Sequence, residues 1–114
     1  MVHASVRIVI PSKKRREVME FLNGMTEQTK VKQGCIFCRV YRDVKEEDVI
    51  MLDELWRNED DLNRHLRSNE YRELLMIIEM AVEPPEIMFH AISDSTGIET
   101  IEKARSDTME HGQR

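Results

Sequence analysis

The spacing of apolar residues switches between a period of two and a helical period along the chain, and the order of these switches limits the possible folds. A period of two, typical of a half-buried strand, comes first in residues 2–10, where apolar residues alternate with His3, Ser5 and Arg7. The predicted strands are residues 2–10, 35–43, 49–56 and 86–93, and the predicted helices begin at Lys13, at Asn58 and near Tyr71. The order β-α-β-β-α-α-β predicts a ferredoxin-like α+β fold, with four antiparallel strands and the helices on one face.

The length of the chain suits one domain and an extension. The chain has 114 residues, the size of a single domain. We expect this domain to occupy residues 1–93 and a C-terminal extension to occupy residues 94–114. The extension contains a short amphipathic stretch, residues 98–105, which is too short to hold as an isolated helix. We therefore expect it to dock on another surface or to fray, and the residues from Ser106 onwards to be disordered.

Charge and composition argue against several classes of partner. The chain has 17 Lys and Arg against 22 Asp and Glu, a formal net charge of -5, whereas nucleic-acid binding needs a net basic surface. No apolar run approaches the ~20 residues that a membrane-spanning helix needs. The N-terminal segment lacks the features of a signal peptide, and two cysteines imply no disulfide framework. We therefore expect a cytoplasmic protein that binds neither nucleic acid nor membrane.

Both faces of the predicted sheet carry apolar side chains. In the third strand, Ile50 and Leu52 point to one face while Met51 and Leu55 point to the other, and the second and fourth strands have the same two-sided pattern. The helices can cover only one face, so a second sheet must cover the other. A second copy of the chain can supply that sheet, which predicts a two-fold homodimer packed sheet to sheet.

His65 is the strongest candidate for a catalytic residue. It lies between Leu62 and Leu66 on the apolar side of a short predicted helix. A histidine in such a place can titrate near neutral pH and transfer protons. The structural alternative is a histidine at the edge of the core, satisfied by a backbone carbonyl.

Trp56 and Glu54 share one face of the third strand. Trp56, the only tryptophan, could form the aromatic wall of a pocket or simply pack in the core. Glu54 places a carboxylate on an otherwise apolar face, which is unfavourable unless it is paired. It could orient a base or anchor a ligand, or it could form a salt bridge with Arg39 or Arg42 across the hairpin.

Tyr71 and Arg39 are further candidates for substrate binding. Tyr71 begins the apolar stripe of the third helix, so its hydroxyl could point into a pocket or its ring could belong to the core. Arg39 shares a strand face with Phe37 and Tyr41. It could anchor an anion or form a cross-strand ion pair.

No motif calls for a flavin, a nicotinamide or a bound metal. The chain lacks a dinucleotide-binding glycine motif, a phosphate loop and a nucleophile elbow. Cys35 and Cys38 form a C-x-x-C sequence, but a strand would point residues three apart to opposite faces, and two thiols without a second pair do not make a zinc site. We expect both cysteines to be buried as small apolar residues.

The segment 53–71 resembles the signature of the antibiotic biosynthesis monooxygenase family. The family shows a strand end of the form Glu-x-Trp, then a short helix with a leucine and a His-Leu pair, then a small polar break. Here these are Glu54, Trp56, Leu62, His65, Leu66 and Ser68. Upstream, Gly34 between Gln33 and Cys35 is similar to the family's glycine-led second strand, and Pro11 after the first strand also fits. The resemblance covers residues 2–93.

This resemblance implies both an assembly and a chemistry. The family fold is a ferredoxin-like unit that dimerises through its sheet into an α+β barrel. Members oxidise aromatic polyketides or quinols with O2 and no bound cofactor: a base removes a phenolic or enolic proton, and the electron-rich anion reduces oxygen. By resemblance, His65 is a pocket residue and the expected base, Trp56 is a pocket wall, and Glu54 and Tyr71 lie beside them.

Other branches of the family suggest alternatives. Haem-degrading members have a tryptophan where this chain has His65, and their haem ligand would fall near Leu75, which cannot bind iron; we therefore reject haem degradation. We expect a cofactor-independent monooxygenase acting on a small quinol or polyphenol. The alternatives are a proton-transfer isomerase of a small keto compound, with His65 as the proton shuttle, and a dimeric small-ligand-binding module without turnover.

Overall fold

The sheet is built around β1 (Val2–Val9), which pairs antiparallel with β3 (Val49–Trp56) on one side and with β4 (Glu86–Ala91) on the other. β2 (Cys35–Arg42) pairs antiparallel with β3, so the strand order is β2-β3-β1-β4. The helices are η1 (Ser12–Lys14, a 3-10 turn), α1 (Arg15–Thr29), α2 (Glu59–Leu66), α3 (Asn69–Ile78) and α4 (Ile98–His111). This computed structural model describes the backbone of residues 1–111 and the side chains of residues 1–106. The predicted ferredoxin-like α+β fold is confirmed.

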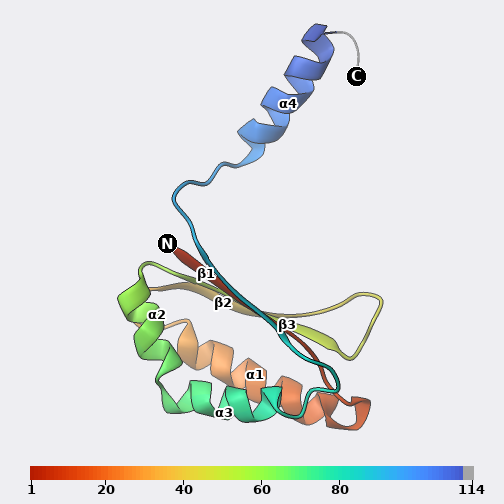
Figure 1. Cartoon of the computed structure of the whole chain (residues 1–114), viewed down its shortest axis with the longest axis vertical. Coiled ribbons are helices and arrows are strands. Elements are labelled where there is room, and N and C mark those ends of the chain that lie inside the picture. Colours follow the sequence, from red (N-terminus) through yellow and green to blue (C-terminus); the bar gives the residue numbers. More distant parts are fainter. Residues whose placement is uncertain (112–114) are drawn as a thin grey trace.

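The core lies between the sheet and the helices α1 and α3, which cover one face of it (Figure 1). β1 shows why the sequence folds this way, because its buried and half-buried residues alternate along the whole strand, as a period of two requires. Ile10 and Ile50 are completely buried on the covered face, where Leu22 of α1 and Leu74 of α3 pack against the sheet. This packing fixes the helices against the strands that carry the candidate site.

No helix of the described residues covers the opposite face of the sheet (Figure 1). Three of its apolar side chains, Tyr41, Met51 and Met88, are exposed. The same face also carries polar pairs, among them His3 with Asp53 and Arg7 with Glu86. It is therefore a mixed surface, more polar than the sequence pattern predicts, and the expected homodimer remains a prediction.

α4 stands apart from the domain, on the side of the sheet that the other helices leave uncovered (Figure 1). It follows β4 after the connection 92–97, and Ile98 and Ile101 expose 69% and 58% of their surface. The helix extends to His111, beyond the predicted stretch 98–105 and into the segment expected to be disordered; residues 112–114 lie outside the described part of the chain. Among the described residues, no helix is both long and apolar enough to cross a membrane.

A β-bulge changes the expected placement of the two cysteines. The register between β2 and β3 shifts between Cys35 and Phe37, so that Cys35 lies opposite Trp56 and Cys38 lies opposite Glu54. Trp56 and Glu54 are two residues apart and share the covered face, so both cysteines lie on that face as well. The prediction that they point to opposite faces is wrong, because it assumed an unbroken strand.

Candidate functional site

The end of β3 and the start of α2 together build a buried polar site. Glu54 and Trp56 lie on the covered face of β3 and are 2% and 0% exposed. After the strand, the Asn58 side chain accepts a hydrogen bond of 2.9 Å from the Asp61 amide and so caps α2. The capped helix then carries His65 back over the sheet, where the residue is buried.

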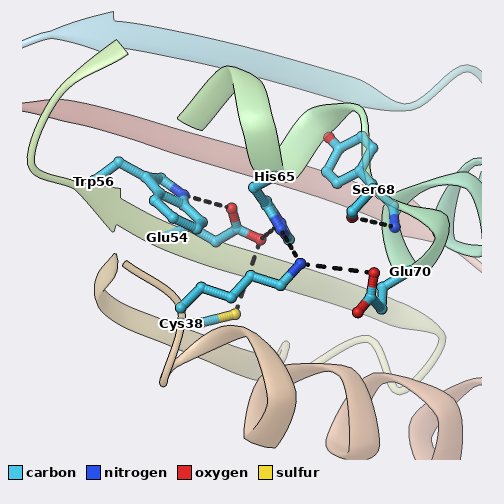
Figure 2. Close-up of polar contacts among 8 residues, drawn as sticks. Cys38, Glu54, Trp56, His65, Ser68 and Glu70 are labelled. Atoms are coloured by element: carbon cyan, nitrogen blue, oxygen red, sulfur yellow. Dashed lines mark hydrogen bonds and ion pairs between the residues drawn. The ribbon is translucent and has the colours of Figure 1, made fainter. Parts of the chain in front are cut away.

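The Glu54 carboxylate is the centre of this site (Figure 2). Its Oε1 accepts a hydrogen bond of 2.8 Å from Trp56 Nε1, and its Oε2 lies 3.3 Å from His65 Nε2. The Cys38 thiol donates to the same Oε2 at 3.8 Å. These contacts satisfy a carboxylate that would otherwise be costly to bury. Neither Arg39 nor Arg42 is among these contacts, so the alternative salt bridge across the hairpin does not form.

Aromatic rings hold the imidazole of His65 on two sides. The Trp56 ring stacks on it with centroids 4.8 Å apart, and the Tyr71 ring meets it edge-on at 5.3 Å. Burial, and then the charge of Glu54, raise the pKa of Tyr71 to about 12, so its hydroxyl stays protonated at neutral pH. Trp56, Glu54, Tyr71 and His65, four of the five predicted site residues, thus lie together.

Arg39, the fifth predicted residue, is not part of this cluster. It is exposed on β2, and its guanidinium lies 4.1 Å from the ring centroid of Phe37. Arg39 lies opposite Asp53 of β3. The residues on either side of Asp53, Leu52 and Glu54, are buried on the covered face, so Asp53 points to the other face. Arg39 therefore belongs to the uncovered face, where it makes a cation–π contact, and its role in substrate binding stays a prediction.

Lys32 is a site residue that sequence reasoning missed. Its Nζ lies 3.1 Å from His65 Nδ1 and 3.7 Å from Glu70 Oε2. The lysine comes from the turn between α1 and β2, and Glu70 lies in the first turn of α3. No periodic pattern marks a turn lysine as the partner of a histidine 33 residues away. The neighbouring Gly34 was the nearest available signal, since it marks the turn itself.

The contacts of His65 define its tautomer. An ammonium group can only donate, so Nδ1 of His65 accepts from Lys32, and a neutral imidazole then carries its proton on Nε2. That proton points at Glu54 Oε2. The lone pair of Nδ1 is therefore the position of the neutral ring that can accept a proton.

A pocket of about 390 Å³ opens beside His65. Its lining residues are Lys32, Gln33, Trp56, Asp61, Arg64, His65, Ser68 and Glu70. A larger depression of about 750 Å³ lies beside the loop between β2 and β3. There the charges are already paired with one another, as in the 2.8 Å contact between Arg15 and Asp48. The smaller pocket is the better candidate site because it joins a basic nitrogen, an aromatic wall and a cation.

The two cysteines are poor nucleophiles in this environment. Burial, and then the charge of Glu54, raise the pKa of Cys35 to about 11. The same two causes raise the pKa of Cys38 further. Since the thiolate is the reactive form, neither thiol is an effective nucleophile at neutral pH. Cys38 is buried, as expected, whereas Cys35 is only half-buried. Among the described residues, no cluster of three or more His, Cys, Asp or Glu has an arrangement that could hold a metal ion.

Comparison with known families gives a match over most of the chain. The family model described as antibiotic biosynthesis monooxygenase matches residues 1–75. The matched region contains β1 to β3, α1, α2 and the start of α3, and so includes every residue of the pocket. No curated protein sequence matches the chain significantly.

Solved structures share the fold at low sequence identity. A protein from Deinococcus radiodurans, provisionally assigned as an antibiotic biosynthesis monooxygenase, has 15% identity and a TM-score of 0.79 over 86% of this chain and 98% of its own. A similarly assigned protein from Nitrosomonas europaea has 15% identity and a TM-score of 0.74 over 82% and 100%. A conserved protein from Methanosarcina mazei has 23% identity and a TM-score of 0.72 over 78% and 89%. Similarity at these identities supports the fold alone.

Proposed function

Because the chain belongs to the antibiotic biosynthesis monooxygenase family, we propose that it is a cofactor-independent monooxygenase that oxidises a small quinol or polyphenolic compound with O2. The observation that carries this proposal is the orientation of His65. Its Nδ1 contacts Lys32, and both residues are among those that line the pocket, while Nε2 faces the buried carboxylate of Glu54.

The reaction begins with a proton transfer. The O–H bond of the substrate breaks, an N–H bond forms at Nδ1 of His65, and the aromatic anion that remains is rich enough in electrons to reduce O2. For a quinol the balance is quinol plus O2 giving hydroxyquinone plus water. One oxygen atom enters the ring, and the other leaves as water after taking up two protons.

The remaining residues bind and orient. Trp56 offers a flat apolar wall that is stacked on the base. Glu54 faces Nε2 and so holds the ring in one tautomer. Tyr71 limits the movement of the ring from its other side.

We also propose that the protein acts as a homodimer joined through the uncovered face of the sheet, in a reducing compartment such as the cytoplasm. The exposed Tyr41, Met51 and Met88 on this face favour such packing. α4 projects on the same side, where a second copy packed on the sheet would lie beside it (Figure 1). Both cysteines are free thiols, as expected where disulfides are kept reduced.

Oxygen uptake tests the proposed reaction. The purified protein is given a panel of reduced naphthoquinones, catechols and anthrones, and the uptake is compared with autoxidation in buffer. We expect uptake above the blank with at least one compound, and a decrease of about 100-fold or more in His65→Asn, which removes the base. Asn63→Ala, at an exposed residue of the same helix as His65, serves as the control and should keep the wild-type rate.

Two results would contradict the proposal. One is an absence of uptake across the panel, which would favour the isomerase or the ligand-binding module. The other is equal uptake by the wild-type protein and folded His65→Asn.

A further inference from the structure

We propose that Lys32 binds the oxyanion of the deprotonated substrate, so that the pocket selects small phenols or enols that ionise on binding. This inference rests on the proposed function, because it concerns the oxygen whose proton His65 removes. In this proposal Lys32 acts beside His65 as a cationic group that binds the substrate oxygen. The substrates are then limited to compounds whose hydroxyl group can ionise.

The backbone holds Lys32 in place while the tip of its side chain stays accessible. The Lys32 amide donates to Thr29 O at 3.0 Å, and the Lys32 carbonyl accepts from the Cys35 amide at 3.1 Å. The side chain is 25% exposed and ends at the pocket, among the residues that line it. The ammonium group can therefore change its partner without any movement of the fold.

In the free protein, Lys32 occupies the position that a substrate hydroxyl must take. Its Nζ lies 3.1 Å from Nδ1 of His65, the one basic nitrogen of that ring. A hydroxyl that donates to Nδ1 must displace the ammonium group. The second contact of Lys32, to Glu70 Oε2 at 3.7 Å, is longer than a good hydrogen bond. The displaced ammonium group thus stays within reach of the incoming oxygen.

The charges around the pocket favour an anion at this position. After proton transfer, the imidazolium of His65 lies between the carboxylate of Glu54 and the new oxyanion. Lys32 then provides a positive charge on the other side of the oxyanion. Arg64, the other cation of the lining, is already bound to Asp61 at 2.8 Å. Lys32 is therefore the better placed of these two cations to receive the new charge.

The pocket also limits the size of the substrate. A volume of about 390 Å³ lies near the lower end of the range for small-molecule sites. Trp56, an aromatic residue, is among the residues that line the pocket. A compound of one or two fused rings, with its hydroxyl directed at His65 and Lys32, fits these dimensions and this chemistry.

Binding of 4-nitrophenol tests the role of Lys32 without any oxidation. Its phenolate is coloured, so one absorbance titration, at a pH just below the pKa of the free phenol, gives both the affinity and the ionised fraction. We expect the wild-type protein to bind it and to increase the ionised fraction. Lys32→Met should weaken binding of the phenolate by about tenfold or more, as expected for the loss of a charge-assisted hydrogen bond. Lys32→Arg should keep most of the effect.

Lys30→Met is the matched control. Lys30 precedes Lys32 by two residues, and its ammonium pairs with Glu27 at the surface at 2.6 Å, so its loss should leave binding unchanged. Equal affinity and an equal ionised fraction in Lys32→Met and the wild-type protein would overturn the proposal, and so would an absence of binding to the wild-type protein. Because oxygen uptake is not measured here, the Lys32 effect can hold even if the monooxygenase proposal fails.

Discussion

At the scale of single residues, the charge of Glu54 affects groups well beyond its hydrogen-bond partners. The carboxylate contacts Trp56, His65 and Cys38 directly. Its charge also helps to raise the pKa of Cys35 and of Tyr71, in both cases as the second cause after burial. One buried carboxylate therefore influences the histidine, the aromatic residues beside it and both thiols.

Glu54→Gln should make Cys35 more reactive. The substitution removes a negative charge that disfavours the thiolate, so the pKa of Cys35 should fall from about 11. At any fixed pH below that value the thiolate fraction then rises, by about tenfold for each unit by which the pKa falls. The rate of alkylation by iodoacetamide, resolved by peptide mass spectrometry, measures this change.

Asp53→Asn is the control for this experiment. Asp53 is adjacent in sequence but pairs with His3 on the other face of the sheet. Its loss should leave the alkylation rate of Cys35 unchanged. An unchanged rate in Glu54→Gln would mean that the carboxylate does not carry the charge assigned to it.

Prediction from sequence succeeded where the signal was local and failed where it was not. The apolar faces of β3 and α2 marked Glu54, Trp56 and His65 as candidates, the family resemblance grouped them, and the structure brings them together. Lys32 could not be found in this way, because its contact with His65 depends on how a turn packs against a distant helix. Arg39 was assigned to the site only because an arginine can bind an anion. The sequence did not show that this residue points to the uncovered face of the sheet.

At the scale of elements, the turn before β2 positions Lys32 and depends on Gly34. This glycine has a φ of +83°, a left-handed conformation that other residues rarely adopt. A Cβ added there would lie 2.2 Å from Asp61 Oδ2 in α2. The carbonyl of Gly34 also accepts a hydrogen bond of 2.7 Å from the Arg57 amide, just beyond β3. Gly34 therefore lies where the start of β2, the end of β3 and α2 meet.

Gly34→Ala should destabilise the protein by about 2 kcal/mol or more, because backbone strain and a steric clash act together. Gly24→Ala is the matched control. Gly24 lies within α1, and an added Cβ there would have no heavy atom within 4 Å. That variant should be about 1 kcal/mol more stable than the wild-type protein. Urea unfolding followed by circular dichroism measures both free energies, and equal stability of the two variants would contradict this role of Gly34.

The elements themselves were more predictable than their details. Apolar residues repeat every two positions in a strand and every 3.6 in a helix because one side of each element is buried in the core. All four strands and the three α-helices of the domain were therefore found from the sequence. The bulge in β2 has no comparable pattern, and it reversed the expected face of Cys35. The length of α4 was also missed, because its described side chains are exposed and a helix without a buried side needs no periodic apolar pattern.

At the scale of the whole molecule, the proposed dimer depends on the uncovered face of the sheet. Met88 of β4 is 51% exposed and lies opposite Ser5 of β1 on this face. Met88→Glu should weaken the dimer, because it would bury a charge in the interface. Sedimentation velocity over a range of concentrations measures the shift toward the monomer.

Met76→Glu provides the control for the dimer. Met76 is 63% exposed on α3, in the helical layer of the domain, so the substitution should leave the dimer unchanged. A wild-type protein that is monomeric at every concentration would refute the proposed assembly. An identical sedimentation profile for Met88→Glu would refute this face as its interface.

The stacking of Trp56 on His65 also gives the protein an internal optical probe. Trp56 is the only tryptophan of the chain, so all of the indole fluorescence of the molecule comes from the wall of the pocket. Its ring lies 4.8 Å from the imidazole and donates to Glu54. Protonation of the histidine or the arrival of an aromatic compound therefore occurs within contact distance of the emitting group. Events at the site can be followed by emission intensity in the unlabelled protein, before any substrate has been identified.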